Sequence, residues 1–376
     1  MEAPPPKFFK MLCSFKVSHF QAILPGIIGI TGIVVLFLMY FKSPPLSICH
    51  IPPAQSGQIK IHSDNKLAEQ QLQYKPLMLL WFWPENKQFD FNVCKKIFKP
   101  VRCQLTDDRS LYSKAEVVVM FHRAIEENMT NLPALARPRI QRWIWFNTDP
   151  KNGTRRIPGI ERLFNLTLTY RKDGDIRVQW QLSARKSTDK DFVLPPKERF
   201  LCWIVEKKKL DTGSGERNRY YRELIKHIPV DVFDRASLSD DDYFQTISSC
   251  KFYLSFEKSD DKDYITETFN GPLAVGTVPI VLGPPRKNYE EFFPGTSFIH
   301  VNDFSDAKTM ADFISRMVDN DETYMRYFGW RKSYVARRHL TQDKYEFARA
   351  ICQACNHVGV YREYRVVPDI YKWYFI

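Results

Sequence analysis

The sequence has few cysteines and lacks a second CxxC motif. Eight cysteines in 376 residues are too few for a small scaffold built from disulfide bonds, although they are enough for a few such bonds in an oxidising compartment. The single Cys352-Gln-Ala-Cys355 motif has no partner motif of the kind that binds structural zinc. The sequence also shows no internal repeat and no long basic tail, and the lack of such a tail argues against an arm that binds nucleic acid.

The overall composition is that of an ordinary globular protein. Hydrophobic residues make up 44% of the chain and charged residues 26%, which excludes a chain that is disordered throughout. At roughly 150 residues per domain, the length predicts two domains and a smaller additional part. The formal net charge of +12 is spread along the chain. This excess of positive charge favours an anionic partner such as a phosphate, a nucleotide or an acidic surface.

Residues 22–41 contain no charged side chain, and a run of this length can cross about 30 Å of hydrocarbon. A buried helix of a globular domain is the alternative, but such a long helix usually carries a polar face. Three lysines precede the segment and only Glu2 opposes them, so the positive-inside rule places this end in the cytosol. No small-residue cleavage site follows. We therefore expect a cytosolic tail (1–21), an uncleaved transmembrane signal anchor (22–41) and a luminal body.

Two features agree with a luminal body. Sequons for N-glycosylation occur at Asn128, Asn152 and Asn165, which is a mild excess over chance. Apart from Cys13 and Cys49, the cysteines lie in the body of the chain. Their spacing alone allows many pairings and cannot choose among them.

The body of the chain has the pattern of an α/β protein. Residues 42–75 are rich in Pro, Ser, Gln and Lys and are expected to form a stem. After them, apolar runs predict strands at Leu77–Trp83, Ala115–Phe121, Trp143–Phe146, Phe200–Val205, Phe252–Phe256 and Val278–Leu282. Helices are predicted at Arg219–His227 and Ala307–Asp319. Alternating strands and helices indicate parallel sheets with right-handed crossovers, and the basic, proline-bearing segment Lys186–Arg199 is the expected boundary between two halves.

Long motifs in a fixed order carry the most specific signal. Asp263-Tyr-Ile-Thr-Glu267-Thr268-Phe269 is followed by Gly276-Thr-Val-Pro-Ile-Val-Leu-Gly283. The further motifs are Asp107–Tyr112, Arg142–Asn147, Leu163–Arg171, Phe252–Glu257, Phe298–Val301 and Cys352–Cys355. Together they resemble the motifs of the α1,3-fucosyltransferases of glycosyltransferase family 10. The resemblance runs from about residue 76 to the C-terminus and is strongest to the vertebrate branch that makes Lewis-type fucosylated N-acetyllactosamine.

The resemblance implies an α/β chain of the GT-B fold, in which two Rossmann-like domains face each other across a cleft. It assigns residues 76–196 to an acceptor-binding domain and residues 197–345 to a GDP-fucose-binding domain. Residues 346–376 would form a tail that returns to the N-terminal domain. One transmembrane helix and a stem would precede these parts, as in Golgi membrane proteins of the single-pass type II class with a luminal catalytic domain.

The implied activity is an inverting α1,3-fucosyltransferase. It would move fucose from GDP-fucose to the GlcNAc of N-acetyllactosamine-type glycans (Lewis x type) on glycoproteins or glycolipids. The family needs no cofactor and no obligatory catalytic metal, and GDP-fucose is its donor substrate. Nucleic acid is not expected as a partner, and a second copy of the chain is kept as a candidate partner.

A pyrophosphate leaving group must be neutralised by cationic side chains and a helix N-terminus when no metal does so. Arg217 stands just ahead of a Tyr-Tyr pair, as in the family, and the resemblance implies that it binds the donor. A solvated helix face is the alternative. Tyr253, Tyr264 and Glu267 match family positions that contact the nucleotide or fucose. For the tyrosines, core packing is the alternative.

A catalytic base must accept the proton of the acceptor hydroxyl. The family uses a Glu in an Asn-x-Glu stretch, and the matching residue here is Asp149. Asp keeps the carboxylate but is one methylene shorter, and a misplacement of about 1 Å can lower a rate about a hundredfold. A turn ahead of Pro150 is the alternative role for Asp149.

Departures from the family concentrate where function is expected. Thr268 replaces the lysine that follows the signature Glu, and Lys258 replaces the Asn of a Phe-Glu-Asn motif. The stretch 206–208 is Glu-Lys-Lys in place of Ser-Asn-Trp, and 85–87 is Glu-Asn-Lys in place of Phe-Gly-Gln. Loss of the signature lysine removes a point charge from the phosphate site. Lys258 and Lys207 are the candidates for a substitute cation, and Thr268 and Lys258 are both assigned to the donor site.

The resemblance also implies acceptor contacts from Trp83, Lys87 and His122. It further implies the disulfides Cys94–Cys352, Cys103–Cys355 and Cys202–Cys250, and it assigns no partner to Cys13 or Cys49. Two other functions stay open. One is a catalytically weakened or inactive family member that binds a nucleotide or a glycan, and the other is a membrane-tethered basic interaction protein.

Overall fold

The structure is a computed structural model that describes residues 74–178, 180–206, 215–317 and 320–376. The expected cytosolic tail, the expected anchor at 22–41 and almost all of the expected stem lie outside these residues, as do Cys13 and Cys49. In the part of the chain that the structure describes, no helix is both long enough and apolar enough to cross a membrane.

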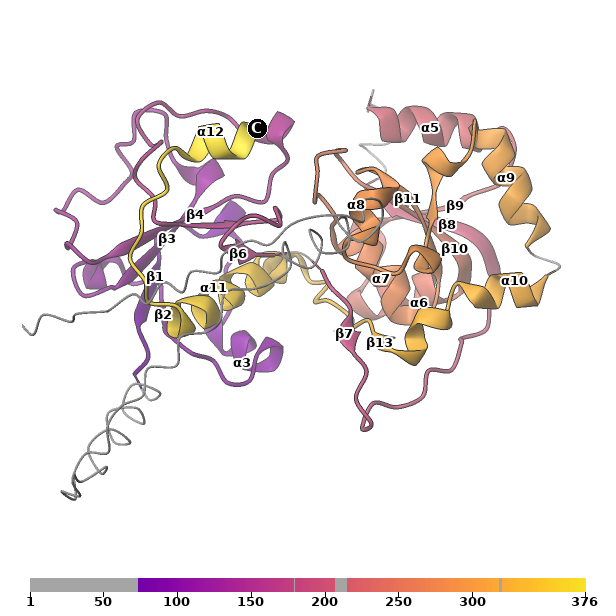
Figure 1. Cartoon of the computed structure of the whole chain (residues 1–376), viewed down its shortest axis with the longest axis horizontal. Helices are drawn as coiled ribbons and strands as arrows, with labels where there is room; N and C mark the ends of the chain where they lie inside the picture. The colour runs from indigo at the N-terminus through magenta and orange to yellow at the C-terminus, as the bar shows by residue number, and fades with distance from the viewer. Residues whose placement is uncertain (1–73, 179, 207–214, 318–319) are drawn as a thin grey trace, which may run out of the picture. The chain divides into compact units, whose positions relative to one another are not determined.

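Residues 77–177 form a six-stranded parallel sheet (Figure 1). In sheet order the strands are β2 (Gln104–Thr106), β1 (Leu77–Leu80), β3 (Val117–Phe121), β4 (Arg142–Phe146), β5 (Leu166–Thr169) and β6 (Ile176–Arg177). Every residue of β3 and β4 is buried, as expected for central parallel strands with both faces covered. The predicted strand at residues 77–83 is shorter than expected and ends at Leu80. Pro84 cannot donate to a ladder, and Glu85 and Asn86 have left-handed φ values of 50° and 58°, so the chain turns away here.

Residues 199–300 form a second parallel sheet of five strands. In sheet order the strands are β12 (Ile299–His300), β11 (Val278–Leu282), β10 (Cys250–Phe256), β8 (Arg199–Val205) and β9 (Asp231–Asp234). The predicted strands of both sheets are therefore confirmed. A short antiparallel pair, β7 (Ser183–Ala184) with β13 (Tyr334–Val335), links distant parts of the chain.

Both sheets have the same strand order. The chain enters at the strand next to one edge, forms that edge strand, and then crosses to the other side, so that β1 neighbours β3 and β8 neighbours β10. In such sheets, ligands bind beyond the carboxyl ends of the strands at the point where the order reverses. In the second sheet this point lies beyond the ends of β8 and β10.

Among the described residues, four helices connect the strands of the second sheet, and two more follow its last strand, β12. They are α5 (Glu216–Leu224), α6 (Asp240–Ser248), α7 (Glu267–Val275), α8 (Arg286–Glu290), α9 (Ala307–Arg316) and α10 (Asp321–Arg326). In α9, Asp306 caps the first turn by accepting from the Thr309 N–H at 2.7 Å, and the buried side chains Ala307, Met310, Ala311 and Ile314 follow helical spacing. The helix predicted at residues 219–227 starts three residues earlier, because Gly215 takes the N-cap position.

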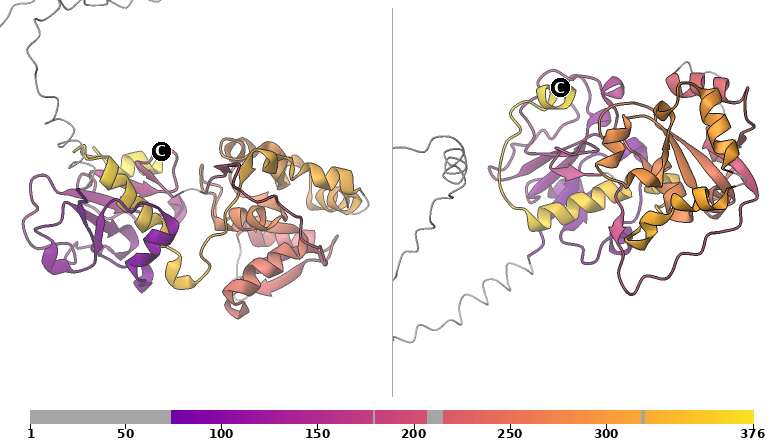
Figure 2. Two further views of the ribbon diagram at one scale, coloured as in Figure 1. Left: turned by 90° about the horizontal axis from the view of Figure 1, so that it is seen from below. Right: turned by 45° about the vertical axis from the view of Figure 1, so that its right-hand side comes forward.

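The C-terminal segment packs on the first sheet. Helix α11 (Ala348–Val360) and helix α12 (Ile370–Phe375) bury Ile351, Val358 and Tyr374 in the same core as β1 to β6. Both helices, in yellow, lie beside the strands of the first sheet in the views of Figures 1 and 2. The segment therefore returns to the N-terminal half of the chain, although it is last in the sequence.

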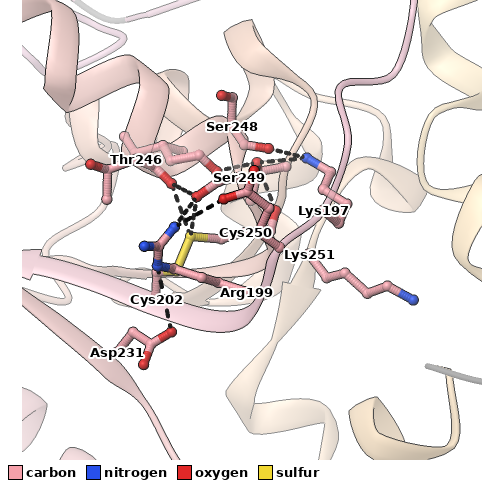
Figure 3. Close-up of a disulfide and its surroundings, with 12 residues drawn as sticks. Lys197, Arg199, Cys202, Asp231, Thr246, Ser248, Ser249, Cys250 and Lys251 are labelled. Atoms are coloured by element: carbon pink, nitrogen blue, oxygen red, sulfur yellow. Dashed lines mark hydrogen bonds and ion pairs between the residues drawn. A yellow bond between two sulfur atoms is a disulfide. The ribbon is translucent and has the colours of Figure 1, made fainter.

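The three disulfides implied by the family resemblance are present. Cys94–Cys352 and Cys103–Cys355 join the N-terminal half to α11, with Cα atoms 5.2 Å apart in each pair. Cys202–Cys250 joins β8 to β10 with a Cα separation of 6.1 Å (Figure 3). Beside it, the Lys197 ammonium donates to the carbonyl oxygens that end α6 and α7, Ser248 O at 2.7 Å and Gly276 O at 2.6 Å. These hydrogen bonds satisfy carbonyl oxygens at two helix C-termini, and burial lowers the pKa of Lys197 to about 7.

Candidate active site

Two cavities lie at the reversal point of the second sheet. The larger has a volume of about 1150 Å³ and the smaller about 450 Å³. The larger cavity is lined by the ends of β8 and β10, the start of α7 and the segment 337–349, and it includes Trp203, Tyr253, Glu267, Thr268 and Arg337. The smaller is lined by the start of α5, the residues after β10 and Asn152 of the N-terminal half. Arg217 and Lys258 line both cavities.

Arg217 occupies the first turn of α5, directly after Gly215 and Glu216. Its guanidinium carbon lies 5.7 Å from the centre of the Trp203 ring. Burial lowers the pKa of Arg217, and the nearby Glu257 and Glu206 act in the opposite direction. An arginine nevertheless stays charged in a protein. The predicted donor-binding arginine is therefore a half-buried cation in the first turn of a helix, beside the backbone N–H groups of that turn.

Glu257 follows β10 and was given no role by the sequence interpretation. Its carboxyl group is buried, and Oε1 accepts from the Thr266 N–H at 2.8 Å and from the Thr268 hydroxyl at 3.3 Å. Burial raises the pKa of Glu257 to about 8, although the bond from Thr266 acts to lower it. The carboxyl group therefore carries a proton on most molecules at neutral pH. A Cβ atom at Gly283 would come within 2.9 Å of this side chain, which explains why glycine is needed there.

The start of α7 presents two of the predicted donor residues. Thr266 caps the helix, and its hydroxyl lies 2.8 Å from that of Thr268. Glu267 lines the larger cavity. Burial raises the pKa of Glu267, and the nearby Lys258 acts to lower it. The Thr268 hydroxyl is therefore hydrogen-bonded within the protein. The Glu267 side chain lines the larger cavity, where a ligand could bind.

The two predicted donor tyrosines differ. Tyr253 is 1% exposed but lines the larger cavity. Tyr264 lines neither cavity and packs edge-on against Tyr170, with ring centres 5.1 Å apart. Tyr253 stays a candidate contact to the donor, whereas the contacts of Tyr264 are those of the core-packing alternative.

Asp149, the predicted base, is held by an arginine that the sequence interpretation did not single out. Both carboxylate oxygens of Asp149 accept from Arg123, with Nε to Oδ2 at 2.9 Å, and Arg123 also pairs with Glu85. The Asp149 side chain is 13% exposed. It does not cap the turn that follows it, Lys151–Gly153. The Asp149 carboxylate thus has a fixed direction, set by the fork geometry of Arg123.

The loop that carries Asp149 is fastened by the C-terminal helix. The Tyr374 hydroxyl donates to the Asp149 carbonyl oxygen, and its ring packs edge-on against Trp145 with centres 5.0 Å apart. The Ile157 N–H donates to the Tyr371 hydroxyl at 2.6 Å. From the second half of the chain, Asp261 Oδ2 accepts from the Lys151 N–H at 2.6 Å. The position of the predicted base therefore depends on residues distant in the sequence.

The two halves of the chain each match a known protein-family domain. The chain matches the C-terminal domain described as glycosyltransferase family 10 (fucosyltransferase) over residues 194–373. It matches the fucosyltransferase N-terminal domain over residues 73–181. The chain belongs to glycosyltransferase family 10.

Family 10 relatives resemble the chain over most of its length. The 4-galactosyl-N-acetylglucosaminide 3-alpha-L-fucosyltransferase 9 of Rattus norvegicus is 37% identical over 91% of this chain and 94% of its own length. The Homo sapiens protein of the same name is 40% identical over 79% of this chain and 82% of its own. The 3-galactosyl-N-acetylglucosaminide 4-alpha-L-fucosyltransferase FUT3 of Pan troglodytes is 34% identical over 79% and 80%. A crystal structure of an alpha1,3-fucosyltransferase with GDP-fucose is 15% identical, covers 76% of this chain and 90% of that chain, and has a TM-score of 0.46.

The side chains that the family resemblance implies as acceptor contacts form salt bridges and hydrogen bonds with other residues of the protein. Lys87 forms salt bridges with Glu85 at 3.0 Å, with Asp343 at 2.9 Å and with Glu346. Burial acts to lower the pKa of Lys87, but hydrogen bonds to these three carboxylates outweigh burial and raise that pKa. Lys87 therefore links the turn after β1 to the segment before α11.

Trp83 and His122 likewise form hydrogen bonds and ring contacts with other residues of the protein. The Trp83 indole donates to Asp107 at 2.9 Å and stacks on Phe91 with ring centres 5.2 Å apart. His122 is 1% exposed, with Nδ1 accepting from the Trp145 indole at 3.0 Å and Nε2 2.8 Å from the Arg155 carbonyl oxygen. Burial lowers the pKa of His122, so the ring is neutral and donates from Nε2. The acceptor roles of Trp83, Lys87 and His122 stay predictions, and His122 lies in the core.

The structure separates the three sequons of this family 10 chain. Asn128 and Asn152 are exposed. Asn165 is 1% exposed: its Oδ1 accepts from the Trp143 N–H at 2.8 Å, and its Nδ2 donates to the Arg365 carbonyl oxygen. A glycan on that Nδ2 would have to fit inside the packed core. The prediction of a glycan at Asn165 is therefore wrong for the folded protein.

We expect Asn165→Ala to lower stability without removing a glycan. The substitution leaves buried partners without hydrogen bonds, at a cost of about 1–3 kcal/mol each. Thermal unfolding would detect the loss, and digestion with an endoglycosidase would show an unchanged mobility shift. Asn128→Ala is the control, which should reduce the shift and leave the unfolding temperature nearly unchanged. A reduced shift for Asn165→Ala would contradict the expectation.

No cluster in the described residues is suited to a metal. Among them, no group of three or more His, Cys, Asp or Glu side chains could hold a metal ion. The cations that the described site offers to an anionic ligand are side chains, Arg217 and Lys258 first among them.

Proposed function

We propose that this family 10 chain is an inverting α1,3-fucosyltransferase. It would transfer fucose from GDP-fucose to the GlcNAc of N-acetyllactosamine-type glycans (Lewis x type) on glycoproteins or glycolipids. The observation that carries the proposal is the pair of cavities meeting at two cations beyond β8 and β10, the place where such sheets bind nucleotides. The activity that the names of the relatives state, 3-alpha-L-fucosyl transfer to 4-galactosyl-N-acetylglucosaminide, supports the linkage and the acceptor.

The proposed reaction is a single displacement. The acceptor hydroxyl oxygen attacks C1 of fucose from the face opposite the diphosphate, and the new C–O bond forms as the bond between C1 and the β-phosphate oxygen breaks. The electron pair of the broken bond leaves with GDP, and the hydroxyl proton passes to Asp149. Arg217 and the N–H groups at the start of α5 stabilise the charge that develops on the diphosphate. Because attack and departure occur on opposite faces, the configuration at C1 inverts.

A catalytically weakened or inactive member that binds nucleotide or glycan is the second candidate. Two observations favour it. Thr268 stands where the resemblance implies a lysine, and its hydroxyl is bonded within the protein. The shortened base, Asp149, has both oxygens on Arg123. A membrane-tethered basic interaction protein has only the net charge to support it.

One assay separates these functions. The protein is incubated with GDP-fucose and type 2 N-acetyllactosamine, and the linkage of the product is determined. An α1,3-fucosylated product supports the proposal. GDP binding by calorimetry without a product selects the inactive member, and the absence of both selects the interaction protein.

We place the protein in the Golgi membrane, as a single-pass type II protein with its catalytic part in the lumen. The support is the uncharged segment 22–41 and the lysines before it. Endoglycosidase treatment of protein made in human cells should increase its mobility, and an unshifted band would contradict this orientation. Association into a homodimer stays a prediction.

Arg217→Ala is expected to weaken GDP binding about tenfold or more. A hydrogen bond between charged groups contributes about 1.5–3 kcal/mol, and 1.4 kcal/mol corresponds to about a tenfold change in affinity. Calorimetry with GDP measures the effect. Arg219→Ala is the matched control, because this residue is exposed on the same helix and lines neither cavity. Equal GDP affinities for wild type and a folded Arg217→Ala variant would remove Arg217 from the site.

A further inference from the structure

The two cavities at the reversal point share a common border, which is formed by the residues that line both. Of the described residues that line them, Arg217 and Lys258 are the two that belong to both linings. Arg217 comes from the start of α5, and Lys258 follows Glu257 after the end of β10. A ligand that occupies both cavities must pass these two cations.

The walls of the two cavities suit different chemical groups. The larger cavity offers aromatic and apolar surfaces from the second sheet, including Trp203, Tyr253 and Phe256. Such surfaces suit a planar base. The smaller cavity is lined mainly by polar and charged residues, and those such as Ser259 and Asp260 suit the hydroxyl groups of a sugar. The two cavities are therefore complementary to the two neutral ends of a nucleoside diphosphate sugar.

The charged part of such a ligand is its central diphosphate, and the charges at the border match it. Burial raises the pKa of Glu257 to about 8, so at neutral pH its carboxyl group cancels little of the positive charge of Arg217. Lys258 lies close enough to Glu267 to influence that carboxyl group, and its side chain is exposed. The border thus presents two cations where a ligand would carry two phosphates.

The residue at position 268 cannot supply that second cation. Thr268 is uncharged, and its hydroxyl bonds to Thr266 at 2.8 Å and to Glu257 at 3.3 Å. It lines the larger cavity and not the smaller one. The family resemblance implies a lysine at this position, which is at the start of α7 and lines the larger cavity.

We propose that Lys258 is the second diphosphate-binding cation of this chain and replaces the lysine that the family carries at the position of Thr268. The positive charge has moved from the start of α7 to the end of β10, and it still faces the same border. This inference rests on the proposed function, because it assumes a nucleoside diphosphate sugar as the donor.

The test uses the wild-type protein and four variants, each with its unfolding temperature checked. Lys258→Asn restores the family residue at this position. We expect it to weaken GDP binding about tenfold and to lower fucose transfer about a hundredfold, since it removes a cation that stabilises the leaving group. Lys258→Arg should keep most of both properties, because it keeps the charge. Lys262→Asn is the matched control, because this exposed lysine of the same loop lines neither cavity.

The fourth variant combines Lys258→Asn with Thr268→Lys. Because it returns the charge to the start of α7, we expect it to recover most of the lost GDP affinity. Unchanged GDP affinity in Lys258→Asn would overturn the inference, and so would a loss that Thr268→Lys does not relieve. The wild type tests the proposed function separately: if it binds GDP and transfers no fucose, the activity fails while Lys258 is still judged by GDP affinity. If it binds no GDP, both fail.

Discussion

Asp149→Asn is expected to lower fucose transfer about a hundredfold or more and to leave GDP affinity nearly unchanged. In the proposed displacement the base acts on the acceptor oxygen alone, so donor binding does not need its charge. Asparagine keeps the size of the side chain and one acceptor oxygen for Arg123. Initial rates at saturating GDP-fucose and calorimetry with GDP measure the two quantities separately.

Three further variants sharpen this test. Asp191→Asn is the control, because Asp191 pairs with Arg185 and is 95% exposed. It should behave like the wild type. Asp149→Glu should raise turnover if the reach of the shorter side chain is the defect. If Asp149→Glu does not raise turnover and Thr268→Lys does, the slow step of the wild type is limited by poor stabilisation of the leaving group. No transfer by the wild type or by any of these variants would favour the inactive family member.

Loss of both disulfides to α11 is expected to destabilise the protein far more than loss of either. In the entropy model, a disulfide stabilises according to the length of the loop that it closes. While Cys103–Cys355 is intact, Cys94–Cys352 closes a further loop of only about a dozen residues, worth about 3 kcal/mol. When both are absent, a loop of about 250 residues is also lost, and the total becomes about 8 kcal/mol. This approaches the whole stability of many domains.

The measurement is urea unfolding of variants in which both cysteines of a pair are replaced by serine. The Cys202–Cys250 pair is the comparison, because it closes an independent loop with a sequence separation of 48 and is worth about 4 kcal/mol. We therefore expect loss of either long-range disulfide alone to cost less than loss of Cys202–Cys250. A cost above about 5 kcal/mol for one of them alone would contradict the linkage.

The strands could be predicted because their signal is local. Apolar runs such as Ala115–Phe121 and Phe252–Phe256 are buried on both faces of a parallel sheet, and this environment appears directly in the sequence. The disulfide pairs came from the family resemblance, since spacing alone left many pairings open. The larger cavity has Arg217, Tyr253 and Glu267 in its lining, and these predicted donor residues likewise came from motif positions.

The remaining parts depend on contacts between distant residues. Arg123 binds Asp149 through its guanidinium group, and Lys87 forms a salt bridge with Asp343. No sequence motif links the two residues of either pair. Burial of the sequon at Asn165 depends on the C-terminal segment, which supplies the Arg365 carbonyl oxygen. Glu257 belongs to a motif that the sequence did show, and its neutral state depends on burial that only the packed sheet creates.

The return of α11 and α12 to the first sheet has a consequence for biosynthesis. Ribosomes add about 5–20 residues per second, so Cys94 and Cys103 wait roughly 10–50 s for partners that lie about 250 residues later. The core of the first sheet also waits for Ile351, Val358 and Tyr374. The main core of the second sheet contains buried residues from 201 to 328 and needs no later residue. The half of the protein that is translated first is therefore the half that completes its folding last.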